Sequence, residues 1–276
     1  MTLTEDTLRF ITAHRHDDVR SLALQAGKHP LVDMPAALTQ IAGRQTAEIK
    51  IPTWAATEGI LYPPHLSMEQ CSSEVTARYK ASVVVGHEGL HNTLADLTGG
   101  FGIDFSFLAP HFEQATYVER QEVLCEVARH NFPLLGLEHF RIEQADGVDY
   151  LRRMQPADWL FLDPARRDGH GSKTVAIADC EPDVSTLESL LLEKAGRVLV
   201  KLSPMLDLTQ ALHTLTHVTE AHLVSAGNEC KELLLLLEQR KDLQPDDVPI
   251  HCINLPTDQP TIVFTRRTEQ EASCSY

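Results

Sequence analysis

Four strand-like segments in succession end in a turn that carries an acid. From about residue 92, apolar segments of strand length alternate with segments of helical spacing. The first four strand-like segments run into DLTGGFG, ER, AD and DPARR. Such alternation predicts a mostly parallel sheet with helices on both faces, which binds ligands at the carboxyl ends of its strands. We therefore predict a Rossmann-like, doubly wound α/β fold with a ligand site at that edge.

The chain before residue 92 has mostly helical spacing. Apolar residues recur at helical intervals up to about residue 48, and an irregular connector follows. The stretch SMEQCSSEVTARYKASVVV predicts one helix, with Ser67 as its N-cap and Gln70 at the capping-box position. Arg78 and Lys80 lie on this helix, and we expect both at the surface.

The last strands differ from the earlier ones in how they are connected. EAHLVSAG and ECKELLLLLEQR are too close in sequence for a helical crossover, which predicts an antiparallel pair. IHCINLP and TIVFTRR are two further short strands, and their places in the fold stay open.

Composition excludes several classes of protein. The formal net charge of −15 is opposite to that of a compact nucleic-acid binder, so an RNA role needs a local basic patch or another domain. No apolar run has membrane-span length, and the N-terminus lacks the pattern of a secretory signal. The six cysteines form no CxxC pair and the 14 histidines no metal motif, so we expect a cytoplasmic protein without zinc or disulfides.

The glycine loop follows the first strand. Asp96 precedes Gly99, Gly100 and Gly102, and this spacing differs from the GxGxxG of dinucleotide folds. A plain strand-to-helix turn explains the loop equally well when it is considered alone.

Three acids at the ends of the next strands favour a ligand. Glu119 is suited to accept hydrogen bonds from a ribose diol, and Asp146 to meet the exocyclic amine of adenine. A solvated charge and a turn residue are the respective alternatives. Asp163 ends a buried apolar run, which packing alone does not explain. Because four independent structural explanations are improbable together, we predict a nucleoside-ligand site.

This order of elements resembles the class I S-adenosylmethionine-dependent methyltransferases over roughly residues 66 to 240. The resemblance implies a seven-stranded sheet whose last strand is antiparallel, and S-adenosylmethionine as cofactor. It implies that the glycine loop holds the methionine part, Glu119 the ribose and Asp146 the adenine, while Asp163 faces the substrate. The cofactor-binding residues expected on this basis are Asp96, Thr98, Gly99, Gly100, Phe101, Gly102, Glu119, Asp146, Gly147 and Gln70. For Gln70, helix capping is an equal alternative.

Several segments resemble a bacterial methyltransferase family with a C-terminal THUMP-like domain: LSMEQCSSEVTARYKA, DLTGGFGIDFSFLA, FLDPARRD, VKLSPMLD and GNECKELLL. The resemblance implies a helical region at 1–65, a methyltransferase domain at 66–240, and a segment at 241–276 leading to an RNA-binding module beyond this sequence. It therefore implies an RNA partner for which that module is needed.

The expected catalytic residues are Asp163, Pro164 and Arg166. Amine-methylating relatives carry Asp-Pro-Pro and an aromatic here, and an Arg plane can also stack on a base. The stretch also resembles the DPPR of pyrimidine-C5 RNA methyltransferases, but Ser203 stands where those need a cysteine. The loop ARRDGHGSKT either contacts a phosphate or is simply solvated.

The favoured hypothesis is therefore an RNA methyltransferase acting on an exocyclic base amine. A small-molecule or protein methyltransferase and a non-catalytic cofactor-binding module are the alternatives. A nicotinamide oxidoreductase ranks last because the glycine spacing is wrong. The oligomeric state stays open.

Overall fold

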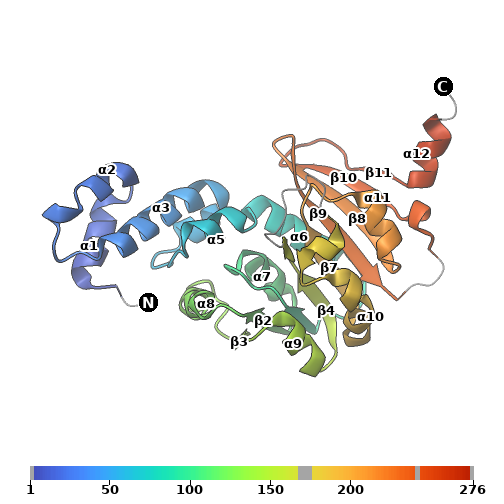
Figure 1. Ribbon diagram of the computed structural model, residues 1–276, viewed down its shortest axis with the longest axis horizontal. Coiled ribbons are helices and arrows are strands. Elements are labelled where there is room, and N and C mark those ends of the chain that lie inside the picture. The colour runs from blue at the N-terminus through green and yellow to red at the C-terminus, as the bar shows by residue number, and fades with distance from the viewer. Residues whose placement is uncertain (1–2, 167–175, 240–242, 274–276) are drawn as a thin grey trace. The chain divides into compact units, whose positions relative to one another are not determined.

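The computed structural model describes residues 3–166, 176–239 and 243–273. Its contacts divide the chain into two compact units, and Figure 1 shows the order of their elements. Unit 1 comprises residues 1–86, 99–110 and 119–144, and unit 2 comprises 87–98, 111–118 and 145–276. Within the described ranges, no helix combines the length and the apolar character that a membrane crossing needs. The five cysteines in these ranges are free thiols.

The main sheet has nine strands in the order β11-β10-β8-β9-β7-β4-β1-β2-β3. Strand β1 pairs in parallel with β2 and with β4, and β4 pairs in parallel with β7, while β9 is antiparallel to both β7 and β8. The close antiparallel pair predicted near the C-terminus is therefore confirmed. The strands are β1 (Thr93–Asp96), β2 (Gln114–Glu119), β3 (Arg141–Gln144), β4 (Ala157–Leu162), β7 (Ala195–Leu202), β8 (Val218–Ala226), β9 (Glu229–Glu238), β10 (Ile250–Leu255) and β11 (Ile262–Phe264).

The prediction of seven strands was wrong because two more strands extend the sheet. Strand β10 pairs in parallel with β8, and β11 pairs antiparallel with β10. Strand β8 would otherwise present unpaired backbone groups at an open edge. The two short segments thus extend the sheet beyond β8. The sequence shows that they are strands, but it does not show which edge of the sheet they join. A separate two-stranded ribbon pairs β5 (Ala165–Arg166) with β6 (Cys180–Glu181).

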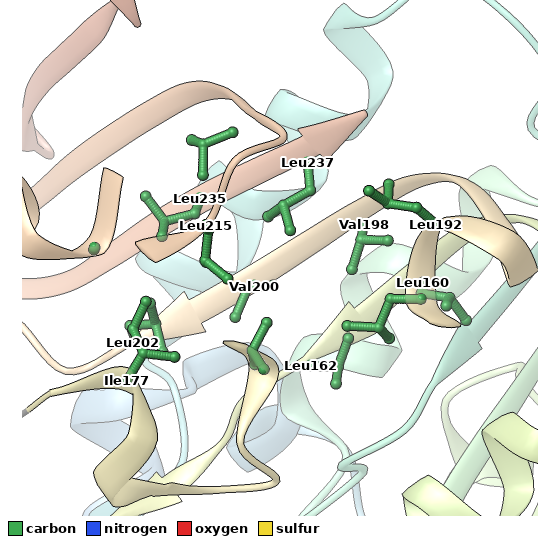
Figure 2. Packing of buried hydrophobic residues seen from close by; sticks show 14 of the residues in the cluster. Leu160, Leu162, Ile177, Leu192, Val198, Val200, Leu202, Leu215, Leu235 and Leu237 are labelled. Atoms are coloured by element: carbon green, nitrogen blue, oxygen red, sulfur yellow. The ribbon is translucent and has the colours of Figure 1, made fainter. Parts of the chain in front are cut away.

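The core of unit 2 is a cluster of buried aliphatic side chains from β4, β7 and β9 and the segments that cover them (Figure 2). Leu233 to Leu237 are all at most 1% exposed, because β9 lies between two strands and both its faces are covered. Full burial of one such leucine side chain stabilises the folded state by about 1.5–3 kcal/mol. The helices of unit 2 are α9 (Gly147–Arg153), α10 (Val184–Lys194), α11 (Leu208–Thr214) and α12 (Arg266–Ser273), with 3-10 turns η3 (Ile177–Asp179) and η4 (Pro245–Asp247).

Unit 1 is mainly helical. Helices α1 and α2 pack on α3 around Phe10, Leu22 and Ile41 (Figure 1). Asp33 caps α3 by accepting a hydrogen bond from the Ala36 amide. The helices are α1 (Glu5–His14), α2 (Val19–Leu24), α3 (Met34–Lys50), α4 (Pro52–Ala56), α5 (His65–Gln70), α6 (Glu74–Gly86), α7 (Ile103–Leu108) and α8 (Glu122–Leu134), with 3-10 turns η1 (Ala26–Lys28) and η2 (Ala109–His111).

The single helix predicted from Ser67 onward is in fact two helices. Helix α5 begins after Pro64 and ends at Gln70, and residues 71–73 are extended or irregular before α6 begins. Ser67 therefore lies inside α5 and is not its N-cap. The hydroxyl of Ser73 accepts a hydrogen bond from the Thr76 amide, so the break supplies the cap of α6.

Three histidines surround Glu220 on β8. Nε2 of His87 lies 3.1 Å and Nε2 of His222 3.3 Å from its carboxylate oxygens. The close contact with His222 and then the hydrogen bond with His87 hold the pKa of Glu220 well below its usual range. Desolvation lowers the pKa of His251. Its ring stacks on that of His222, with ring centroids 4.6 Å apart. The described ranges contain no group of His, Cys, Asp or Glu side chains placed to hold a metal ion.

These lowered pKa values predict that acid destabilises unit 2. Stability linked to His251 is lost as pH falls below its ordinary pKa of 6.5, and that linked to Glu220 as pH falls below 4.5, because the unfolded chain then binds more protons. In urea unfolding between pH 5 and 4, we expect Glu220→Gln to lose less stability than the parent chain. Identical losses would contradict this assignment.

Candidate functional site

The glycine loop lies in unit 1, between β1 and α7. Gly100 and Gly102 have φ of +56° and +90°, a backbone region that strains any L side chain. The Gly102 amide donates to the carbonyl of Gly99 at 2.9 Å, which closes the turn. Phe101 is 3% exposed and packs edge-on against Trp54, with ring centroids 4.8 Å apart. The loop is therefore a tight turn anchored by a buried aromatic ring.

Glu119 lies in the same unit and bonds to this loop. Its carboxylate accepts a hydrogen bond from the Gly100 amide at 2.9 Å and another from the Gln121 amide at 2.8 Å. The side chain is not a solvated strand-end charge, because Glu119 is only 7% exposed. Each carboxylate oxygen has two acceptor positions, so both can still accept a hydroxyl. Binding of a ribose diol by Glu119 stays a prediction with which this geometry is compatible.

Asp96, Thr98 and Asp163 meet in unit 2 at the carboxyl ends of β1 and β4. Asp96 is 1% exposed, and its Oδ1 accepts from the Thr98 amide at 3.0 Å. Asp96, the last residue of β1, is opposite Phe161 in the parallel register, one residue before β4 ends. The Thr98 hydroxyl then accepts from the Asp163 amide at 2.6 Å. The side chain of Thr98, in the turn after β1, thus holds the backbone of the turn after β4.

Asp146 is the N-cap of α9. Its Oδ1 accepts hydrogen bonds from the amides of Val148 at 2.9 Å and Asp149 at 3.1 Å. This capping explains the acid without a ligand. Contact of Asp146 with an adenine amine therefore stays a prediction, as does a contact of Gly147 with cofactor.

Gly147 is required by close packing. A Cβ there would lie 2.1 Å from the carbonyl oxygen of Leu97. We expect Gly147→Ala to lower the free energy of unfolding by about 1–3 kcal/mol, because backbone must move to relieve the clash. Gly196→Ala is the matched control in unit 2, where the nearest atom would be 3.5 Å away. Chemical denaturation measures both, and equal stabilities would refute the clash.

Lys201 is a site residue that the sequence interpretation missed. It lies on β7, and its Nζ forms an ion pair with Oδ2 of Asp163. The side chains of Lys201 and Asp163 are 12% and 33% exposed. The available signal was a lone lysine in the apolar strand RVLVKL, since a buried charge needs a partner.

A buried charge lies in unit 1, and it shows that the surface position expected for Lys80 was wrong. Lys80 is 0% exposed, and its Nζ lies 3.1 Å from Oδ1 of Asp104 on α7. The Ser72 hydroxyl donates to the other oxygen of Asp104 at 2.7 Å. Helix α6 therefore turns its lysine toward α7, while Arg78 pairs with Glu74 near the surface.

The remaining predicted residues have simpler positions. Gln70 is exposed at the end of α5 in unit 1. Pro164 is buried directly after Asp163, and Arg166 lies in β5, opposite Cys180. Residues 167–175 of the predicted basic loop, including Lys173, lie outside the described residues.

The strand order with β9 antiparallel, and the acids after β1 and β4, define a Rossmann-like methyltransferase fold. The crystal structure of a "putative methyltransferase" from Porphyromonas gingivalis W83 is similar to 98% of this chain, with 33% identity and a TM-score of 0.81. The match covers 68% of that protein. The chain belongs to the family of this Porphyromonas protein.

Two other solved structures have lower sequence identity and lower structural similarity to this chain. A SAM-dependent methyltransferase from Agrobacterium tumefaciens has 15% identity and a TM-score of 0.42, over 60% of this chain and 62% of its own. An rRNA methylase from Streptococcus thermophilus has 16% identity and a TM-score of 0.41, over 59% and 95%. No protein-family model matches this chain, and no curated protein does.

Proposed function

We propose that this protein transfers a methyl group from S-adenosylmethionine to an exocyclic amine of an RNA base. The observation that carries the proposal is Asp163, whose carboxylate stands at the carboxyl end of β4, the ligand-binding edge of such sheets. Kinship with the Porphyromonas protein supports methyl transfer. RNA as the acceptor rests on the sequence resemblance alone.

The residues present fit S-adenosylmethionine. The glycines at positive φ leave the loop backbone open to close approach, and Glu119 keeps acceptor capacity for a ribose diol. Asp146 uses one oxygen for capping, and its other oxygen is suited to an adenine amine. Within unit 2, Asp96 and Thr98 shape the turn after β1.

Asp163 carries the acceptor chemistry. When bound, S-adenosylmethionine supplies an electrophilic methyl group on a positively charged sulfur. Oδ1 of Asp163 accepts a hydrogen bond from the acceptor N–H and so orients the nitrogen lone pair. Transfer would place the methyl carbon on the nitrogen and leave the C–S electron pair on sulfur, and Oδ1 of Asp163 would take the proton that the nitrogen loses.

Calorimetric titration of S-adenosylmethionine and S-adenosylhomocysteine, with NADH as the control ligand, tests the cofactor. We expect micromolar binding of the first two and binding at least about tenfold weaker in Glu119→Ala, which loses a charge-assisted hydrogen bond. Glu122→Ala removes an exposed acid three residues later and should bind normally. Absence of binding by the folded parent chain would contradict the proposal.

Methyl transfer tests the acceptor. Tritiated S-adenosylmethionine is incubated with the protein and, in separate reactions, with unmodified bacterial ribosomal RNA, a lysine-rich peptide or a pool of small amines. Label in RNA that chromatography identifies as an N-methylated base supports the proposal. Label confined to the peptide or the small amines would replace it with one of the other methyltransferase classes.

A further inference from the structure

Lys201 is an unusual residue for its position in the sheet. Strand β7 lies between β4 and β9, and its residues 198–200 and 202 are buried and apolar. A central strand with both faces covered normally carries only apolar side chains, because a buried cation loses its hydration. Lys201 is nonetheless 12% exposed, and a carboxylate offsets that loss. The lysine therefore calls for an explanation in terms of Asp163.

Asp163 is held from two sides. Its backbone amide donates to Thr98 Oγ1 at 2.6 Å, and its Oδ2 accepts from Nζ of Lys201. Both anchors come from unit 2, on β7 and the turn after β1. Among the described residues, no hydrogen bond to Oδ1 is made, and a third of the side chain is exposed. The ion pair thus occupies Oδ2, and Oδ1 of this partly exposed side chain keeps its acceptor positions.

The charges of this pair discriminate between kinds of amine. An alkyl amine such as a lysine side chain is protonated at neutral pH, because its ordinary pKa is about 10.4. A lone carboxylate would attract that cation, but the neighbouring Lys201 ammonium repels it. An amine on an aromatic base is neutral and needs only an acceptor for its N–H. The formally neutral pair therefore suits the second kind.

We propose that Lys201 is a positioning and specificity-determining residue that fixes Asp163 with Oδ1 open, and so selects a neutral base amine over a protonated alkyl amine. The choice of a base amine rests on the function proposed above. The fixed carboxylate rests only on the contacts within unit 2. These two parts predict different measurements, which separates failure of one from failure of the other.

The first measurement is a binding experiment that needs no methyl transfer. Butylammonium is titrated at pH 7 into the parent chain, Lys201→Met and Lys201→Arg, each with S-adenosylhomocysteine present. We expect Lys201→Met to bind butylammonium at least about tenfold more tightly than the parent, since the repelling charge is gone. Lys201→Arg should resemble the parent. Equal affinities in the parent and Lys201→Met would overturn the selection.

The second measurement separates positioning from a merely structural role. With unmodified ribosomal RNA as the probe, we expect Lys201→Met to lower kcat at least about tenfold while its KM for S-adenosylmethionine is unchanged. Lys201→Arg should restore most of kcat. An unchanged kcat, or no rescue by arginine, would overturn the positioning role. Should Lys201→Met not fold, by circular dichroism, Lys201→Gln takes its place in both experiments.

Absence of transfer to RNA by the parent chain would overturn the function proposed above and, with it, the preference for a base amine. The butylammonium comparison would still judge whether Lys201 repels cations at Asp163. The parent chain could instead transfer methyl to RNA while Lys201→Met has the same kcat and the same butylammonium affinity as the parent. The proposed function would then stand, and Lys201 would have no role in positioning or selection.

Discussion

Lys80→Met is expected to lower the free energy of unfolding by about 3–5 kcal/mol. Lys80 is fully buried on α6, and the substitution leaves the 9% exposed Asp104 as a buried carboxylate without its ammonium partner. The hydrogen bond from Ser72 remains but does not neutralise the charge. Urea unfolding followed by circular dichroism measures the loss.

Two further variants make this result specific. Arg9→Met removes the cation of an exposed ion pair with Glu5 in the same unit, and should change stability by less than about 1 kcal/mol. The double variant Lys80→Met/Asp104→Asn should recover much of the loss, because no buried charge remains. A loss in Lys80→Met no larger than that in Arg9→Met would show that the buried pair is unimportant for stability.

Asp163→Ala is expected to lower kcat for methyl transfer by about 10²–10⁴-fold. The substitution removes the oxygen that we assign to the acceptor N–H, together with the partner of Lys201. Affinity for S-adenosylmethionine, measured by calorimetry, should change by less than about tenfold, because cofactor binding is assigned to other residues.

The control for this variant is Glu193→Ala, which removes an exposed acid of α10 in the same unit and should leave turnover unchanged. Equal losses of turnover and cofactor affinity in Asp163→Ala would show that the carboxylate holds the cofactor or the fold. The assignment of Asp163 to the substrate would then be dropped.

Much of unit 2 could be predicted from the sequence because its signals are local. The alternation of strands with helices, the short connection between β8 and β9 and the apolar run of β9 each span a few neighbouring residues. The break between α5 and α6 was missed because its only sequence signal, the capping residue Ser73, is weak against the helical spacing around it. The extended backbone of Cys71 is visible only in the structure.

The candidate site was predicted one strand end at a time. Asp96 and Glu119 are the last residues of β1 and β2, and Asp163 directly follows β4, close to where they were predicted. Asp146 lies two residues beyond β3 and not at its end, and the ligand roles of all four stay predictions. Their hydrogen bonds could not be foreseen, since the Asp163 amide meets a threonine 65 residues earlier. Gly147 was assigned to the cofactor, whereas the structure also gives it a packing reason against Leu97.

The amino-acid sequence by itself determined the class of fold, the antiparallel pair and the acids at or near the ends of β1 to β4, because chain periodicity and strand-end chemistry are local properties. Only the tertiary structure decided that β10 and β11 extend the sheet, that Lys80 is buried against Asp104, and that the partly exposed Lys201 pairs with Asp163. Lys201 and Asp163 are 38 residues apart, and adjacent strands of the folded sheet bring them together. Such partners depend on strand order and helix packing, which local spacing does not encode.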